Sequence, residues 1–192
     1  MELRINSRWV MNSNENRLSS GVWYALQTFY QKELEVESFL REQGYQPFIP
    51  RLYREITGKG GKKSRQLVPA VHNLLFLSKH GDGREQARLL VECPVPVRLM
   101  CHRDTGLFYE IPDQEMMEFR AICDPEFSDT LYTTRDFAEA RPGKLVRVIH
   151  GHFKGRVGKL VRFQGHYYMV VCLVDLGVFL RISRWYCEPL ED

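Results

Sequence analysis

The sequence predicts an α+β protein in which an amino-terminal α/β sandwich, an antiparallel sheet with flanking helices, is joined to a small β-barrel. Two observations carry the prediction. Segments typical of strands and of helices follow one another through residues 22–123. From Pro142 onward, short strand-favouring segments and regularly placed glycines predominate. A chain of 192 residues, 44% of them hydrophobic, is long and apolar enough to build two small cores.

The first module is expected to begin with a strand and a helix. Residues 1–21 are polar and rich in Asn and Ser, so we expect a flexible extension there. The segment 22–29, VWYALQTF, is aromatic and β-branched, as strands are. In the following YQKELEVESFLREQG, Val36 and Leu40 share one helical face, and Gly44 ends the helix.

Further strands and two more helices are expected in the first module. Pro47 and Pro50 hold their segment extended, because proline is excluded from helix interiors and restricts the residue before it. The next elements are strands at 65–71 and 74–79, a short helix at 84–92, a hairpin formed by 97–102 and 107–111, and a helix at 113–123.

Charge is unevenly distributed along the chain, whose formal net charge is +3. Residues 110–139 hold nine carboxylates and two arginines, and residues 140–174 hold seven cationic side chains and no carboxylate. We expect an acidic linker at 124–141 and the barrel at 142–192. A basic module beside an acidic connector suits docking on a phosphate-rich partner. The alternative is that both are solvent-exposed faces whose charges differ without function.

Glycines in the segment PGKLVRVIHGHFKGRVGKL, residues 142–160, predict a turn between two strands. Glycine supplies positive φ angles and lets two backbones approach closely. We therefore expect Gly151 and Gly155 at the two ends of a tight turn, with Phe153 held between them. The complete set of expected turn positions is Gly143, Gly151, Phe153, Gly155 and Gly158.

The chain carries no recognisable catalytic motif. It has no GxSxG, HExxH, Walker loop or GxGxxG sequence, and GKGGKKS lacks the spacing of a phosphate loop. We expect a protein that is not an enzyme and that uses no cofactor. His150 and His152 could offer two metal ligands, but Cys172 is too weak a third, and surface histidines beside a turn are the favoured interpretation, so no metal site is expected.

Cysteines and apolar runs indicate the compartment. The five cysteines are scattered and form no CxxC pair, which favours reduced thiols in a cytoplasmic protein. No apolar run approaches the roughly 18–20 residues that a membrane span needs. The first residues contain no apolar leader, so neither a secretory signal nor a membrane partner is expected.

Two stretches in the expected order resemble the NusG-like transcription elongation factors. WYALQTFYQKE, FIPRLYREI, a basic glycine-rich loop and VPAVHNLLFL are similar to the amino-terminal (NGN) domain of that family. The glycine pattern at 142–160 is similar to the KOW motif of SH3-like barrels. IPDQEMMEF followed by GKLVRVIHGHFKGRVGKLVRF looks closest to specialised antiterminators of surface-polysaccharide operons in Bacteroides-like bacteria. The resemblance covers 22–189, and implies an NGN-like domain at 22–123 and a KOW barrel at 142–192.

The resemblance implies that the first domain binds the clamp of the largest RNA polymerase subunit through an apolar surface on its sheet. By their positions in the matching strands, the residues expected to contact polymerase are Gln27, Phe29, Leu74 and Phe76. The alternative is that Leu74 and Phe76 are core residues, since alternation lets one face of a strand point inward. Relatives usually carry Pro-Gly-Tyr where this chain has His72-Asn73-Leu74, so an aliphatic side chain replaces the expected ring.

The loop 58–65 holds four cations and no acid. In relatives, a hairpin tip near this position approaches the far side of the polymerase cleft or the non-template DNA strand. Cations here would neutralise phosphates and confer little sequence preference. The alternative is a solvated loop without this role. The candidate nucleic-acid-binding residues are Lys59, Lys62, Lys63 and Arg65.

In relatives the barrel recruits a ribosomal protein or a termination factor. We expect an apolar loop at 176–179 to serve here, with Leu176 and Phe179 as the contacts, and a barrel strand packed inward is the alternative. The sequence therefore predicts a monomeric transcription elongation and antitermination factor that binds RNA polymerase, with non-template DNA or nascent RNA as further partners. The alternative function is a ribosome- or rRNA-associated structural protein that uses the same barrel.

Overall fold

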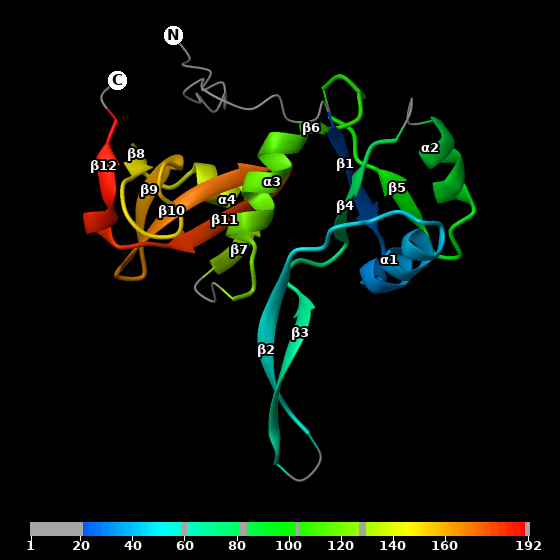
Figure 1. Ribbon diagram of the computed structural model, residues 1–192, viewed down its shortest axis with the longest axis horizontal. Helices are drawn as coiled ribbons and strands as arrows, with labels where there is room; N and C mark the ends of the chain where they lie inside the picture. Colours follow the sequence, from blue (N-terminus) through cyan, green and yellow to red (C-terminus); the bar gives the residue numbers. More distant parts are fainter. Residues whose placement is uncertain (1–20, 59–60, 81–83, 103, 127–129, 191–192) are drawn as a thin grey trace.

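The computed structural model describes residues 21–190, apart from 59–60, 81–83, 103 and 127–129. Lys59 and almost all of the expected extension at 1–21 lie outside the described residues. Within them, the chain forms two modules that lie side by side, and a long β-hairpin projects away from both (Figure 1).

The first module is built on an antiparallel sheet whose central strand is β1 (Val22–Thr28). Strand β4 (Leu74–Ser78) pairs with one edge of β1. Two short strands, β5 (Val97–Leu99) and β6 (Glu110–Pro112), pair with opposite ends of its other edge. The predicted first strand is confirmed, and its aromatic and β-branched residues are those that suit a pleated, buried surface.

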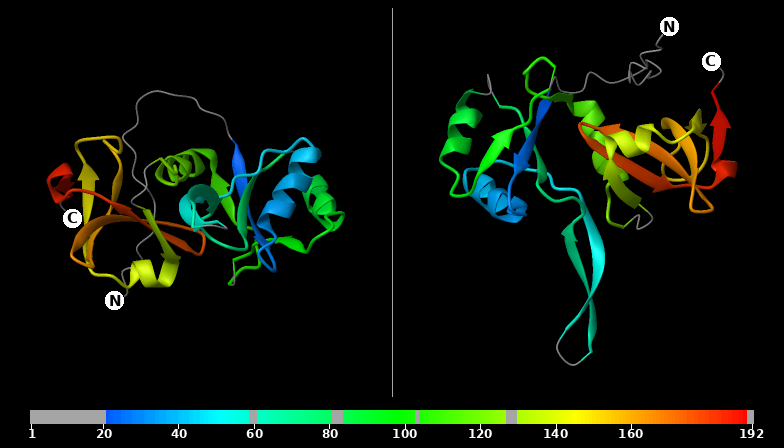
Figure 2. Two further views of the ribbon diagram at one scale, coloured as in Figure 1. Left: turned by 90° about the horizontal axis from the view of Figure 1, so that it is seen from below. Right: turned by 180° about the vertical axis from the view of Figure 1, so that it is seen from behind.

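Three helices flank this sheet. They are α1 (Glu33–Glu42), α2 (Arg84–Val91) and α3 (Asp113–Ile122), close to the predicted ranges. Each has a carboxylate in its first turn and an arginine in its last turn, which favours the helix dipole. The first two lie on one side of the sheet and α3 lies on the other (Figure 2).

Side chains of β1 point alternately to the two faces of the sheet, so this one strand contributes to two hydrophobic cores. Tyr24 and Leu26 belong to a cluster that includes residues of α1 and α2. Trp23 and Ala25 point to the opposite face and belong to the cluster that includes α3. The first module therefore has an apolar sheet surface on both sides.

The second module is a six-stranded antiparallel sheet in the order β12-β8-β9-β10-β11-β7. Its strands are β7 (Thr130–Thr134), β8 (Gly143–Val148), β9 (Val157–Phe163), β10 (His166–Leu173), β11 (Leu176–Arg181) and β12 (Cys187–Pro189). The strands predicted from β-branching at the C-terminal end are confirmed. The expected small barrel is an open path here, because no pairing among the described strands joins β12 to β7.

The second module begins earlier than the sequence indicates. The range 124–141 was expected to be an acidic linker, yet β7 lies within it and pairs with β11 from Leu176↔Thr134 to Leu180↔Thr130. The short helix α4 (Arg135–Glu139) follows, and Ala138 is buried beside Phe179 in a core of this module. This part of the chain is therefore the edge of a sheet and its covering helix, and the linker is shorter than expected.

The two modules share one apolar core. Its residues come from β1 and β4 of the first sheet, from α3, and from β8, β10 and β11 of the second. Phe119 of α3 contacts Phe76 at a ring-centroid distance of 5.6 Å, and it lines a small cavity with Met169 and Val171 on the other side. Helix α3 is therefore packed between the two sheets (Figures 1 and 2).

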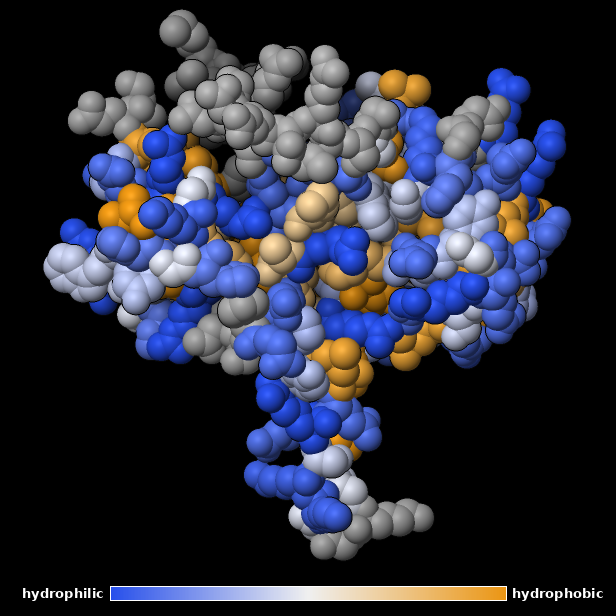
Figure 3. Space-filling view, viewed as in Figure 1, coloured by the Kyte–Doolittle hydropathy of each residue, from blue (hydrophilic) through white to orange (hydrophobic). Residues whose placement is uncertain are grey.

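The projecting hairpin consists of β2 (Arg51–Thr57) and β3 (Lys63–Pro69). Its seven residue pairs run from Arg51↔Pro69 to Thr57↔Lys63. The loop expected at 58–65 is shorter than predicted, because the last three of its residues form the start of β3. The hairpin surface is mainly hydrophilic (Figure 3), which suits a segment surrounded by solvent or by a polar partner.

Candidate functional site

Strand β4 carries two of the residues expected to contact polymerase, and both are buried. Phe76 is fully enclosed, and its ring lies 6.3 Å from that of Phe48 and 5.6 Å from that of Phe119, centroid to centroid. Leu74 belongs to the same shared core. In this arrangement α3 and the second module cover the apolar face on which both residues lie.

Leu74 also borders a hollow between the two modules. The hollow has a volume of about 540 Å³. Gln27 and Met100 line it from the first module, and Tyr132 and Leu176 line it from the second. The structure therefore brings together Gln27 and Leu74, which are partners in the β1–β4 pairing, at the edge of the contact between modules.

Gln27 and Phe29 lie at the end of β1, next to Arg98 of β5. The guanidinium of Arg98 donates two hydrogen bonds to Oε1 of Gln27, at 3.1 Å from Nε and 2.7 Å from Nη2. The same guanidinium carbon lies 5.5 Å from the centroid of the Phe29 ring. Arg98 is a residue that sequence reasoning missed, and its cation–π contact positions this edge of the sheet.

The turn before β4 is tied to α1 through a buried carboxylate. One oxygen of Glu33 lies 2.8 Å from Nδ1 of His72, and the other accepts a hydrogen bond from the backbone N–H of Asn73 at 3.2 Å. Asn73 has φ +62°, in the left-handed region where Asn is among the tolerated residues. Asn73 thus provides the left-handed turn residue before β4, and its backbone N–H is held by Glu33.

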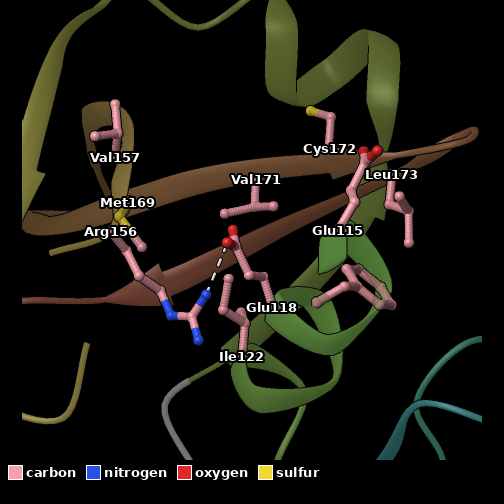
Figure 4. Close-up of a pocket in the computed structure, with 10 residues that line it drawn as sticks. Glu115, Glu118, Ile122, Arg156, Val157, Met169, Val171, Cys172 and Leu173 are labelled. Carbon is pink, nitrogen blue, oxygen red and sulfur yellow. Dashed lines mark ion pairs between the residues drawn. The ribbon is translucent and has the colours of Figure 1, made fainter. Parts of the chain in front are cut away.

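Charged side chains of α3 face the second module across a small cavity (Figure 4). Nη1 of Arg156 lies 3.4 Å from Oε2 of Glu118. Burial raises the pKa of Glu118, and the cation of Arg156 opposes that rise. Burial also raises the pKa of Glu115, helped by the charge of Glu118 and opposed by Arg135. The contact between the modules therefore holds partly buried ionisable groups at the margin of an apolar core.

The described candidate cations lie on the hairpin. Nζ of Lys63 is 3.4 Å from Oε2 of Glu55, and both side chains are 72% exposed. The guanidinium of Arg65 stacks 3.9 Å from the centroid of the Tyr53 ring. Lys62 is exposed at the tip, and Arg54 adds a cation on the opposite strand that sequence reasoning missed. A cationic strip with one internal acid, Glu55, therefore runs along the face of the distal hairpin that carries Lys63 and Arg65, and Arg54 lies on the opposite face.

The glycine-rich turn lies between β8 and β9. Gly151 and Gly155 have φ +80° and +88°, which a side chain would strain, and the N–H of Gly155 donates to the Val148 carbonyl at 2.7 Å. Phe153 is half-buried against the shared core. Gly143 and Gly158 lie where a side chain would not fit: a Cβ would lie 2.5 Å from the Leu160 backbone carbonyl at Gly143 and 2.6 Å from the Met169 side chain at Gly158.

The expectation of an exposed apolar loop at 176–179 is wrong. Leu176 and Phe179 lie in β11 and are buried. The turn lies before this run, at residues 174–175, and Val174 has a φ of +54°. The run is apolar because both faces of β11 are covered: Val178 belongs to the core shared with the first module, and Phe179 packs under α4.

Other features bound the chemistry. In the ranges that the structure describes, no group of three or more His, Cys, Asp or Glu side chains is arranged to hold a metal ion. None of the described helices is both long and apolar enough to cross a membrane.

Comparison with known families defines the class of the protein as a transcription factor. The family described as "Transcription termination factor nusG" matches residues 21–120, slightly more than half of the 192 residues. The chain belongs to the NusG family, and is a transcription elongation factor of the kind that binds RNA polymerase and is not an enzyme. No curated protein matches the chain.

Proposed function

We propose that this NusG-family protein is an antitermination factor that binds the clamp of the largest RNA polymerase subunit. It suppresses pausing or termination on a restricted set of operons, of the surface-polysaccharide kind that the sequence resemblance implies. The observation that carries the proposal is the apolar face formed by β1, β4 and α3, which the second module covers. An apolar patch with a polar rim is what a protein partner requires.

The polymerase surface is proposed to form when the second module moves away from this face. Leu74 and Gln27 border the hollow between the modules and would be uncovered first. Phe119 and Ile122 of α3 would follow, since they line the cavity that faces β10. Phe76 then supports this surface from beneath, and Phe29 with Arg98 forms its rim.

Binding to core polymerase tests the proposal. We expect the full-length protein to co-elute with core RNA polymerase in gel filtration, and Gln27→Ala together with Leu74→Ala to weaken that association about tenfold or more, as for contacts at the centre of an interface. Leu34→Ala is the matched control, because Leu34 is 45% exposed on α1 at the opposite side of the sheet. Thermal unfolding of each variant verifies that the fold persists.

Two results would contradict the proposal. One is the absence of polymerase binding by the full-length protein. The other is association with ribosomal subunits alone, which would favour the ribosome- or rRNA-associated function.

For the second module, we propose an SH3-like KOW barrel that recruits a ribosomal protein or a termination factor. Its contacts lie outside the buried positions Leu176 and Phe179.

A further inference from the structure

The second module presents a large aromatic side chain to solvent. Trp185 lies in a single 3₁₀ turn (Arg184–Tyr186) between β11 and β12, and it is 83% exposed. Tyr186 beside it is 46% exposed and lies against the glycine turn at Gly151. Burial of an indole is strongly favourable, so an exposed, isolated Trp is a feature that the fold itself does not explain.

The backbone around Trp185 is fixed at both ends. The N–H of Ile182 donates to the Tyr167 carbonyl at 3.1 Å, and the N–H of Ile149 donates to the Tyr186 carbonyl at 2.8 Å. These bonds attach the turn to β10 on one side and to the end of β8 on the other. The Trp185 side chain therefore projects from an anchored support, and little ordering of the backbone is needed on binding.

A hollow of about 600 Å³ opens beside Trp185, a volume within the usual range of ligand sites. Arg181 and Arg184 contribute two cations to its lining, and His166 and Tyr167 contribute two more rings. Arg181 donates a hydrogen bond to Nδ1 of His166 at 3.2 Å. Among the described residues that line the hollow there is no carboxylate.

The charge of the surrounding module has the same sign. Residues 130–190 contain ten lysines and arginines and four carboxylates, Asp136, Glu139, Asp175 and Glu188. Glu188 lies opposite Arg147 in the pairing of β12 with β8. The hollow thus lies in a module with a strong excess of positive charge, which attracts a polyanion.

We propose that this hollow binds single-stranded nucleic acid, with one base stacked on Trp185 and an adjacent phosphate held by Arg184. An exposed indole offers a flat face on which any unpaired base can stack, and guanidinium groups neutralise the phosphates of the nucleic-acid backbone. A duplex keeps its bases stacked within the helix and cannot use the indole in this way. The site is separate from the hairpin cations and does not depend on the proposed binding of polymerase.

The test uses the full-length protein with Lys62, Lys63 and Arg65 all changed to Ala, which removes the three described hairpin cations proposed to contact phosphates. Fluorescence anisotropy follows binding of labelled oligo(dT) and oligo(U) of about 12 nucleotides, within the range of known single-strand sites. We expect Trp185→Ala to weaken binding about tenfold, and Trp185→Phe to retain most of the affinity because it keeps an aromatic face. Tighter binding of one oligonucleotide identifies the strand as DNA or RNA.

Arg184 is tested through the salt dependence of binding. If Arg184 neutralises one phosphate of a single strand, Arg184→Ala should reduce the slope of log K against log salt concentration by about 0.7. Arg88→Ala is the matched control, because Arg88 is an exposed cation on α2 in the first module. The control should leave the slope unchanged.

Three outcomes would overturn the proposal. The first is equal affinity of the Trp185→Ala variant and its parent for both oligonucleotides. The second is tighter binding of a duplex of the same length than of either single strand. The third is failure of the parent to bind any oligonucleotide while Trp185 is required for capture of a protein partner, which would assign the hollow to that protein.

Discussion

Glu115 and Glu118 are carboxylates that α3 carries into a largely apolar contact. Burial raises the pKa of both groups, and Arg156 compensates only Glu118 through a direct ion pair. A carboxyl whose folded-state pKa is raised contributes stability when it is protonated. That contribution is complete below the ordinary value of 4.5 and is lost as the pH rises through the folded-state pKa.

Glu115→Gln should therefore stabilise the protein near neutral pH. The amide resembles the protonated acid and carries no charge that burial would penalise. We expect a higher Tm for the variant than for the natural chain at about pH 7, and no difference at about pH 4, where Glu115 is protonated in both states. Thermal unfolding across this range gives the difference directly.

Glu118→Gln is the matched control for that experiment. It removes a partly buried charge as well, but it also leaves Arg156 without the carboxylate 3.4 Å away. Its gain in Tm at neutral pH should be smaller than that of Glu115→Gln. A larger gain for Glu118→Gln would mean that the ion pair across the modules contributes nothing to the contact.

The hairpin formed by β2 and β3 is the element whose function depends most on exposed charge. Lys62, Lys63 and Arg65 are the described cations that we propose to contact phosphates of non-template DNA, with Lys59 as a fourth. Glu55 lies opposite Arg65 in the β2–β3 pairing and next to Lys63. Its carboxylate would repel a phosphate at the same position.

Opposite effects are therefore expected from two hairpin variants. Changing Lys62, Lys63 and Arg65 to Ala should weaken binding to an elongation complex. It should also reduce the slope of log K against log salt concentration by about 2–3, because three phosphate contacts are lost. Glu55→Ala should strengthen binding, because it removes the acid from the strip. Both are measured as affinity against salt concentration, and an identical slope for the triple variant and the natural chain would remove the DNA role.

Local signals predicted most of the elements. Helix α1 was recognisable from the apolar spacing of Val36 and Leu40, and the turn at Gly151 and Gly155 from glycines whose positive φ is a local requirement. β7 was missed because TLYTT is a strand only where it meets the edge of β11, more than forty residues later in the chain.

Burial from two sides explains the other errors. The run from Leu176 to Phe179 was expected to be exposed because an apolar loop is typical of a binding site, yet the first module covers one face of it and α4 the other. Likewise, the alternation of side chains along β4 does not indicate which of its two faces a second module covers. These contacts depend on tertiary packing that no local pattern encodes.

The whole molecule is held in its present arrangement by α3, which belongs to the core of both modules. The contact is apolar at its centre and has the Arg156–Glu118 pair at its margin (Figure 4). If polymerase binds the covered face, the free energy of separating the modules is subtracted from its affinity. Weakening the contact should then strengthen polymerase binding.

Arg156→Glu tests this coupling, because it places two carboxylates opposite each other. We expect faster amide hydrogen exchange in α3 and tighter binding of core polymerase. The double variant Arg156→Glu with Glu118→Arg restores opposite charges and should return both measurements toward those of the natural chain. If exchange in α3 rises and polymerase binding stays the same, the covered face is not the polymerase surface.

The position of β7 has a practical consequence for anyone who isolates the C-terminal half. A fragment that starts at Pro142 lacks the strand that pairs with β11 from Thr130 to Thr134, and it also lacks the helix that shields Phe179. Its outermost strand would have unpaired amides and carbonyls along a strongly apolar sequence, a template for joining a second copy. Self-association of such a fragment would reflect where it was cut, and would say nothing about the oligomeric state of the intact protein.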